Sequence, residues 1–287
     1  MRWLKTIALS SLVLPVQGEH LAVVPGWINY GRDAEGSPSQ YRPLKLGGAF
    51  DRFGRVTAID FVGDHAPTDR IAGEMAEFLA RIASKGPATI LGLSYGAMMT
   101  ILARKLVDSQ NIHTVLIDPP AGGDSLIKLN QLHVAALAEK IGELPEWLNG
   151  GLPQWLFDKL FCPGFSSSDP IAVPKGLSEE GVVRYIAGVR KDAYDGQQGF
   201  PLTRCFEQIG AMARADGLPE ACAKITQRGD RVTRILCTKD NQVVDPAVAN
   251  PFFREHLTNA FVREFPANHA DFLQQRDLWS SFLKNLL

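Results

Sequence analysis

A serine between two glycines is the clearest chemical signal in this sequence. Gly92, Ser94 and Gly96 form a G-x-S-x-G pattern in TILGLSYGAMMTILARKL, between an apolar run and a helical run. A nucleophile on a tight strand-to-helix turn needs small neighbours, and the following helix points N–H groups at the reacting centre. This context favours a nucleophilic Ser94 over a turn serine without chemistry.

A serine hydroxyl is a weak nucleophile near neutral pH, so a histidine base is required. Of the six histidines, His269 lies in FPANHADFL, in a turn between the last strand-like run and a final helix. Such a turn can deliver a side chain to the edge of a sheet where the serine lies. His20 and His113 open strand-like runs, and a surface role is expected for His256. We therefore predict that His269 is the general base.

Two aspartates compete for the role of the acid that orients the histidine. Asp240 follows a strand-like run in RILCTKDNQVVD and precedes a polar turn that can hydrogen-bond its remaining lone pairs. Asp118 closes the run HTVLID, but two prolines follow it and fix the backbone there. We favour Asp240, because its strand comes directly before the one that leads to His269, and we keep Asp118 as the alternative. Asp245 precedes a proline and is expected to cap a helix.

A tetrahedral intermediate needs two N–H donors aimed at its oxygen. The backbone N–H of Tyr95, directly after the serine, is the first expected donor. The second is expected from the loop VVPGWINYG, where Gly26 allows a close approach of the backbone and Trp27 supplies the N–H. The side chains of Trp27 and Tyr95 are also candidate walls of a substrate site.

The elements that must position these residues alternate between strands and helices. Continuous apolar runs, typical of strands covered on both faces, are HLAVV (20–24), RVTAIDF (55–61), ATILGL (88–93), HTVLID (113–118), RVTRILCT (231–238) and AFVREF (260–265). Between the second and third, the segment 69–86 repeats its apolar residues at helical spacing. The alternation predicts an α/β fold with a mostly parallel central sheet flanked by helices.

One long segment interrupts this alternation. Residues 124–230 contain helical patches but no strong strand-like run, so we expect a mainly helical cap inserted between two core segments, 19–123 and 231–287. Within the cap, LPEWLNGGLPQWLFDKLFCPGF is dense in aromatic and aliphatic residues, among them Trp155 and Phe157. These two side chains either form a small core in the cap or line an acyl pocket.

The composition excludes some classes of partner and leaves the compartment open. Thirty basic residues against 31 acidic ones give a net charge of −1, so a nucleic-acid partner is not expected. Residues 1–18 fit either a secretory signal peptide, for a secreted or periplasmic protein, or a leading strand in a cytoplasmic one. No stretch is long and apolar enough to span a bilayer. The four cysteines lack a CxxC pairing, so no zinc site is indicated.

Together these features resemble the α/β-hydrolase family, in its lipase, esterase and thioesterase-like branch. The resemblance rests on PGW at 25–27, GLSYG at 92–96, the strand before Asp240, and Asn268 next to His269. It implies an eight-stranded sheet with a variable cap inserted after the sixth family strand. The sequence departs from the family where PGW replaces the common HG. It also departs at the N-terminus, where the two leading strands are expected to be absent or abbreviated.

The predicted reaction is hydrolysis of a small acyl ester or thioester through an acyl-enzyme intermediate on Ser94. Neither a metal nor an organic cofactor is required. The same fold and triad can also support acyl transfer or lyase chemistry, and a non-catalytic binding protein could keep the fold. A dinucleotide-binding protein is disfavoured, because no G-x-G-x-x-G follows the first strand-like run.

Overall fold

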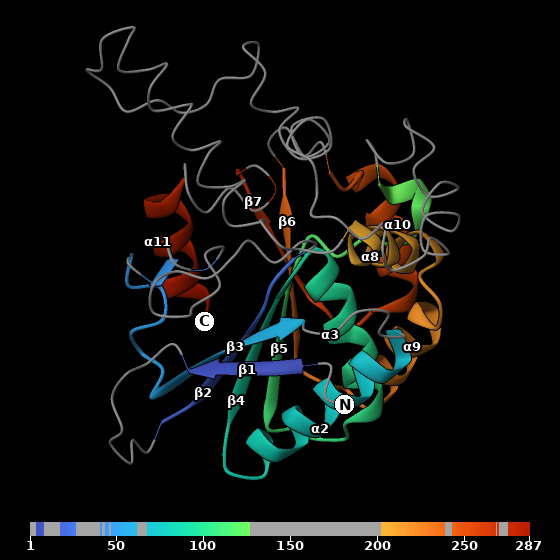
Figure 1. Ribbon diagram of the computed structural model, residues 1–287. Helices are drawn as coiled ribbons and strands as arrows, with labels where there is room; N and C mark the ends of the chain where they lie inside the picture. The colour runs from blue at the N-terminus through green and yellow to red at the C-terminus, as the bar shows by residue number, and fades with distance from the viewer. Residues whose placement is uncertain are drawn as a thin grey trace, which may run out of the picture.

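The computed structural model describes residues 4–8, 18–26, 41, 44–45, 47–61, 68–126, 202–238, 243–267, 269 and 275–287. These residues contain a seven-stranded sheet in the order β1-β3-β2-β4-β5-β6-β7 (Figure 1). The strands are β1 (Leu4–Ala8), β2 (His20–Val24), β3 (Arg55–Phe61), β4 (Ala88–Leu93), β5 (Ile112–Ile117), β6 (Val232–Cys237) and β7 (Phe261–Phe265). All six runs expected to be strands form strands, and the mostly parallel sheet is confirmed.

The edge strand β1 is the one antiparallel member of this sheet. It pairs with β3, from Leu4 opposite Phe61 to Ala8 opposite Thr57, whereas every other neighbouring pair is parallel. One antiparallel leading strand is therefore present, where the sequence predicted that both leading strands are absent or abbreviated. Residues 4–8 adopt the strand that was one of the two alternatives for the N-terminal segment.

Helices cover both faces of the sheet. They are α2 (Thr68–Ala83), α3 (Tyr95–Leu106), α8 (Leu202–Arg214), α9 (Leu218–Gln227), α10 (Pro246–His256) and α11 (Arg276–Leu286), with a short 3₁₀ turn, η2, at Gly123–Ser125. Figure 1 shows α11 on one side of the sheet and α2, α3, α9 and α10 on the other. The buried side chains accordingly form two apolar clusters, one on each face.

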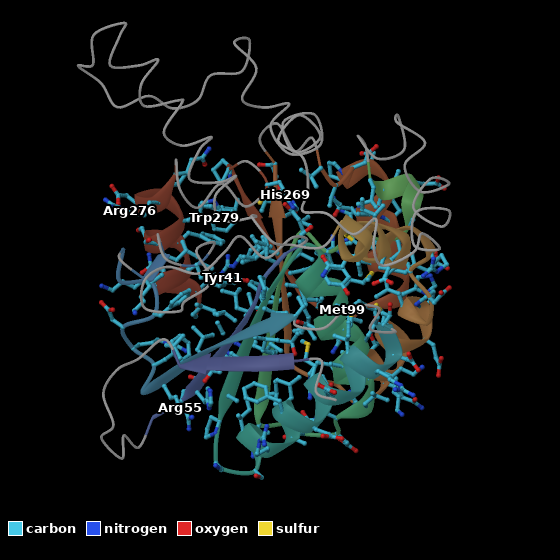
Figure 2. The ribbon with its side chains drawn as sticks, in the orientation of Figure 1. Tyr41, Arg55, Met99, His269, Arg276 and Trp279 are labelled. Carbon is cyan, nitrogen blue, oxygen red and sulfur yellow. The ribbon has the colours of Figure 1, made fainter. Side chains whose placement is uncertain are left out.

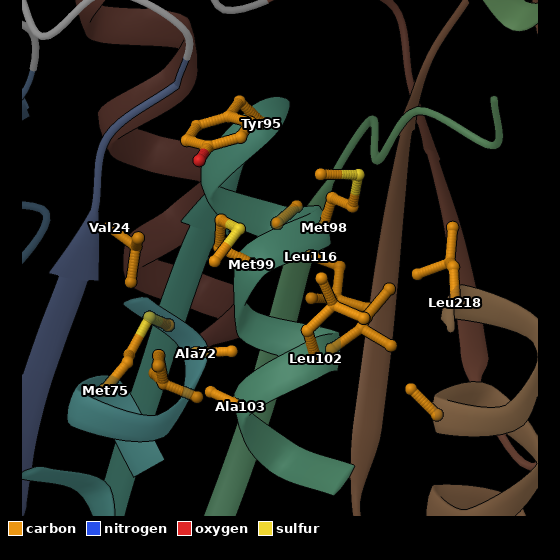
Figure 3. Packing of buried hydrophobic residues seen from close by; sticks show 14 of the residues in the cluster. Val24, Ala72, Met75, Tyr95, Met98, Met99, Leu102, Ala103, Leu116 and Leu218 are labelled. Carbon is orange, nitrogen blue, oxygen red and sulfur yellow. The ribbon is translucent and has the colours of Figure 1, made fainter. Parts of the chain in front are cut away.

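Helix α3, which begins directly after Ser94, lies in the middle of the larger cluster. Figure 3 shows Met99 of α3 facing Met75 of α2, while Leu102 faces Leu218 of α9. All four side chains are nearly or fully inaccessible to solvent. Burying one side chain of this size stabilises the folded state by about 1.5–3 kcal/mol. The packing on both sides fixes the direction in which the first turn of α3 points.

A buried charge network fastens the other end of α3 to the start of β6. Asp230 Oδ2 accepts hydrogen bonds from Arg104 Nη2 at 2.7 Å and from Arg228 Nη2 at 2.8 Å. The side chains of Arg104 and Asp230 are fully buried. Buried charges require such partners, since leaving one unpaired is costly.

The core extends into the segment that was expected to be a cap. Leu218, Ala221 and Ile225 of α9 are buried in the same cluster as α3, as is Met212 of α8. The helical cover of the sheet thus resumes well before residue 230, the predicted end of the insertion. Residues 127–201 lie outside the described part of the chain. In the part that is described, no helix is long and apolar enough to cross a membrane.

Candidate active site

Ser94 stands on the turn between β4 and α3, as the sequence predicted. Its backbone has φ 50° and ψ −117°, a conformation that residues other than glycine rarely adopt. Its N–H donates to the carbonyl of Ile117 at 2.8 Å, which ties the turn to the end of the neighbouring strand β5. Strain of this kind costs of order 1–3 kcal/mol and is commonly found at functional sites.

The two flanking glycines are required by close contacts of the backbone. A Cβ at Gly96 would lie 2.2 Å from the carbonyl oxygen of Pro25 and 2.7 Å from that of Val24. A Cβ at Gly92 would lie 2.8 Å from Cα of Ala97. The G-x-S-x-G pattern therefore has a steric reason in this fold. The strand-to-helix turn at Ser94, called the elbow below, packs closely against the loop that follows β2.

That loop is the one expected to supply the second oxyanion donor. Tyr41, which is fully buried, donates its hydroxyl to the carbonyl of Val24 at 2.5 Å and so holds the start of the loop. Burial raises the pKa of the Tyr41 phenol well above its usual value, which keeps it a donor. Trp27 itself lies outside the described residues. The sequence contained no signal that singled out Tyr41.

The ring of Tyr95 belongs to the core. It is 1% exposed and packs edge-to-face on Phe61, with 5.4 Å between the ring centroids. Its backbone opens α3, at the positive end of the helix dipole. This position is compatible with the expected role of the Tyr95 N–H, while the ring packs away from any open surface.

His269 pairs with Asp118. Its Nδ1 lies 3.0 Å from Asp118 Oδ2, and the two side chains are 9% and 4% exposed. The other carboxylate oxygen, Oδ1, accepts the N–H of Cys237 at 3.0 Å. The Asp118 side chain thus extends across the end of β6 to reach the histidine beyond β7, and Figure 2 shows His269 at this end of the sheet. Asp240, the acid favoured from the sequence, lies outside the described residues.

Ser94 and Asp118 leave the sheet at the same level. Leu93 of β4 is in register with Ile117 of β5, so the residues that follow them are neighbours at the carboxyl edge. Asp118 also has a positive φ, of 41°. No hydrogen bond joins His269 to Ser94 among the described residues; such contacts often form only when substrate is bound.

Two other histidines that the structure describes have structural roles. His20 hydrogen-bonds Thr57, and His113 hydrogen-bonds Thr233 at 2.9 Å. Burial is the main cause that lowers the pKa of each to about 4, so both are neutral near pH 7. Asp245 caps α10 by accepting the N–H of Ala247 at 2.8 Å, as predicted. The described residues contain no cluster of metal-ligating side chains.

Comparison with known proteins identifies the fold independently. The model of the alpha/beta hydrolase family matches residues 14–279. A lipase-esterase related protein from Clostridium acetobutylicum is 14% identical with a TM-score of 0.60, and each chain covers all of the other. The α/β hydrolase MGS-M2 from a Medee basin deep-sea metagenome library is 12% identical with a TM-score of 0.62, covering 98% of this chain and 93% of its own.

A thermophilic esterase from Thermogutta terrifontis is a further structural neighbour, 14% identical with a TM-score of 0.57, covering 99% of this chain and 92% of its own. No curated protein matches the chain by sequence. At such low identities these structures support the fold and not a particular substrate.

Proposed function

Since the chain belongs to the α/β hydrolase family, we propose that it hydrolyses a carboxylic ester or thioester through an acyl-enzyme intermediate on Ser94. The observation that carries the proposal is the buried His269–Asp118 pair, held at 3.0 Å at the sheet edge where the strained Ser94 also stands. Backbone strain at a serine on the same sheet edge as an oriented imidazole supports a catalytic role for this site.

In the proposed reaction, Ser94 Oγ attacks the acyl carbonyl carbon while His269 Nε2 takes the hydroxyl proton. The N–H groups of Tyr95 and Trp27 stabilise the oxyanion. The tetrahedral intermediate then expels the alcohol or thiol, which receives the proton from His269. Water attacks the acyl-enzyme with His269 again as base, and the acid is released with Ser94 restored. These steps need neither a metal nor an organic cofactor.

We assign the orienting carboxylate to Asp118. His269 Nδ1 carries a single proton when the ring acts through Nε2, and Asp118 Oδ2 lies within hydrogen-bond distance of that nitrogen. The Cys237 N–H fixes the other oxygen of the carboxylate, so its orientation does not depend on His269. An Asp240 carboxylate would have to compete for the same nitrogen.

The proposed substrate class rests on the predicted cap. We propose that Trp155 and Phe157 contribute to an apolar wall over the site, which favours an acyl or aromatic ester of a small molecule. A p-nitrophenyl ester series of increasing chain length, compared between the wild type and Trp155→Ala, tests this. An unchanged chain-length preference would assign Trp155 to the packing of the cap.

The role of Ser94 is tested by covalent labelling and by turnover. We expect a fluorophosphonate to label the wild type and not Ser94→Ala, and turnover of p-nitrophenyl esters to fall by several orders of magnitude in the variant. Labelling elsewhere, or near wild-type turnover, would contradict the mechanism. Addition of an alcohol acceptor distinguishes hydrolysis from acyl transfer, because transfer yields a new ester.

The acid is tested by Asp118→Asn and Asp240→Asn on one ester. Asparagine tolerates a positive φ, so Asp118→Asn removes the charge and keeps the backbone. We expect kcat to fall by about 10²- to 10⁴-fold in Asp118→Asn, because the imidazole loses its tautomer and its counter-charge. Asp240→Asn should lower kcat far less. If Asp240→Asn lowers kcat more than Asp118→Asn does, the acid is Asp240, in the segment that follows β6.

A further inference from the structure

A second buried charge lies behind the acid. Arg234 of β6 is 2% exposed, and its guanidinium lies over the ring of Phe253 in α10, with Cζ 4.9 Å from the centroid. Its Nη2 donates to Asn250 of the same helix. Its Nε has no hydrogen-bond partner, and it forms no ion pair with any carboxylate that the structure describes. A buried guanidinium without a carboxylate partner is costly and requires an explanation.

Arg234 shares a small cavity with the acidic residue Asp118. Both side chains line one cavity of about 10 Å³, together with Asn250 and Phe253. This volume is far below the roughly 300 Å³ of a small-molecule site, so the cavity is no substrate pocket. The backbone holds the two strands together at this point, since the Asp118 N–H donates to the carbonyl of Ile235 at 3.1 Å.

Arg234 keeps its charge in this environment. Burial lowers its pKa to about 10, and the nearby Asp118 carboxylate opposes that effect. The other titratable groups that act on it, within the described part of the chain, are Arg254 of α10 and Cys222 of α9. Arg254 repels the guanidinium, and burial raises the pKa of the Cys222 thiol to about 12, so that thiol is neutral near pH 7. Among the residues that the structure describes, Asp118 is therefore the group of opposite charge that acts on Arg234 at neutral pH.

We propose that Arg234 is a positioning residue for the catalytic pair: its buried charge, which shares a cavity with Asp118, acts on the carboxylate that contacts His269. This inference rests on the proposed function, in which that carboxylate orients the base. With a neutral imidazole the three side chains sum to zero charge. Proton transfer from Ser94 to His269 adds one positive charge, which Asp118 must balance while Arg234 opposes it.

The proposal predicts the sign of one pH effect. Without the guanidinium, a proton binds more readily to the Asp118–His269 pair, because a nearby positive charge has been removed. The acid limb of the kcat/KM profile should then move to higher pH. A residue that only filled space would change the height of the profile without moving the limb.

The test compares Arg234→Met with Arg234→Lys, which keeps a charge. We expect the acid limb to move up in Arg234→Met and to return towards the wild-type position in Arg234→Lys. Arg228→Met is the control, since it removes a partly buried cation of the Asp230 network and should leave the limb in place. If Arg234→Met does not fold, Asn250→Leu, which releases the guanidinium, should give a smaller shift of the same sign.

A second readout separates this inference from the proposed function. The ring of His269 is followed by NMR as the pH is changed, with its signal assigned by its loss in His269→Gln, and the midpoint should rise in Arg234→Met. If no ester is hydrolysed but the midpoint moves, the proposed function fails and the positioning role stands. An unmoved midpoint and limb in folded Arg234→Met would overturn the inference.

Discussion

Replacing Gly96 by alanine should damage both the stability and the activity of the protein. A Cβ at this position would lie 2.2 Å and 2.7 Å from the carbonyl oxygens of Pro25 and Val24, where ordinary contacts begin near 3.4 Å. Neither oxygen can rotate away, because both belong to the backbone and Tyr41 holds that of Val24. Overpacking against backbone on this scale costs about 3 kcal/mol of unfolding free energy.

The same contact joins the elbow to the loop of Trp27. Relieving it requires a movement of about 1 Å, and misplacement of that size can lower kcat/KM by about 10²-fold. Urea unfolding measures the first effect, through a lower midpoint at unchanged slope, and ester kinetics measure the second.

Gly73 of α2 is the matched control. A Cβ there would meet nothing within 4 Å, so Gly73→Ala should raise the unfolding free energy by about 0.5–1 kcal/mol through backbone entropy alone. Its kcat/KM should match that of the wild type. If Gly96→Ala unfolds at the wild-type urea concentration and retains full activity, the close packing of the elbow against the loop is refuted.

Two further predictions concern buried polar groups away from the elbow. Burial, with a smaller effect of Arg231, lowers the pKa of His113 to about 4, so the unfolded chain binds a proton at higher pH than the folded chain. The contribution of His113 to the unfolding free energy is fully present above about pH 6.5 and is lost as the pH falls towards 4. At pH 5 the loss is about 2 kcal/mol. Urea unfolding at pH 7 and pH 5 should show a smaller difference for His113→Gln than for the wild type. Asp230→Asn should lower the unfolding free energy by about 3–5 kcal/mol, because it leaves the buried Arg104 without its charged partner. Glu220→Gln, at an exposed ion pair, should leave the urea midpoint nearly unchanged.

Local patterns in the sequence were sufficient to predict the elements of the sheet. The run ATILGL forms β4 as written, and Met75 and Leu79 of the segment 69–86 are buried on the inner face of α2. Strands covered on both faces have a continuous apolar signature, which does not depend on distant residues. The glycines on either side of Ser94 could be recognised in the sequence in the same way, because the requirement for glycine at these positions is local.

The partner of the histidine could not be chosen by local reasoning. Asp118 and Asp240 both follow apolar strands, and the polar turn after Asp240 favoured it as the acid. The sequence does not reveal that Asp118 adopts a positive φ and reaches over β6, where the Cys237 N–H receives it. Arg234 lies in a run that was predicted to be an apolar strand. Its burial could not be predicted locally, because it depends on helix α10, which follows later in the chain.

Backbone strain provides an independent argument for Asp118. Among the described residues, Ser94, Asp118 and Ala215 are the non-glycine residues with positive φ. Ser94 and Asp118 end adjacent strands at the same register, one as the proposed nucleophile and the other within 3.0 Å of the proposed base. A strained conformation persists only where surrounding contacts enforce it. Here two hydrogen bonds hold the strained residues. The Ser94 N–H donates to the carbonyl of Ile117 in β5, and the Asp118 N–H donates to the carbonyl of Ile235 in β6. The sheet register that positions Ser94 thus also places the Asp118 carboxylate within reach of His269, which supports the proposal that Asp118 is the acid.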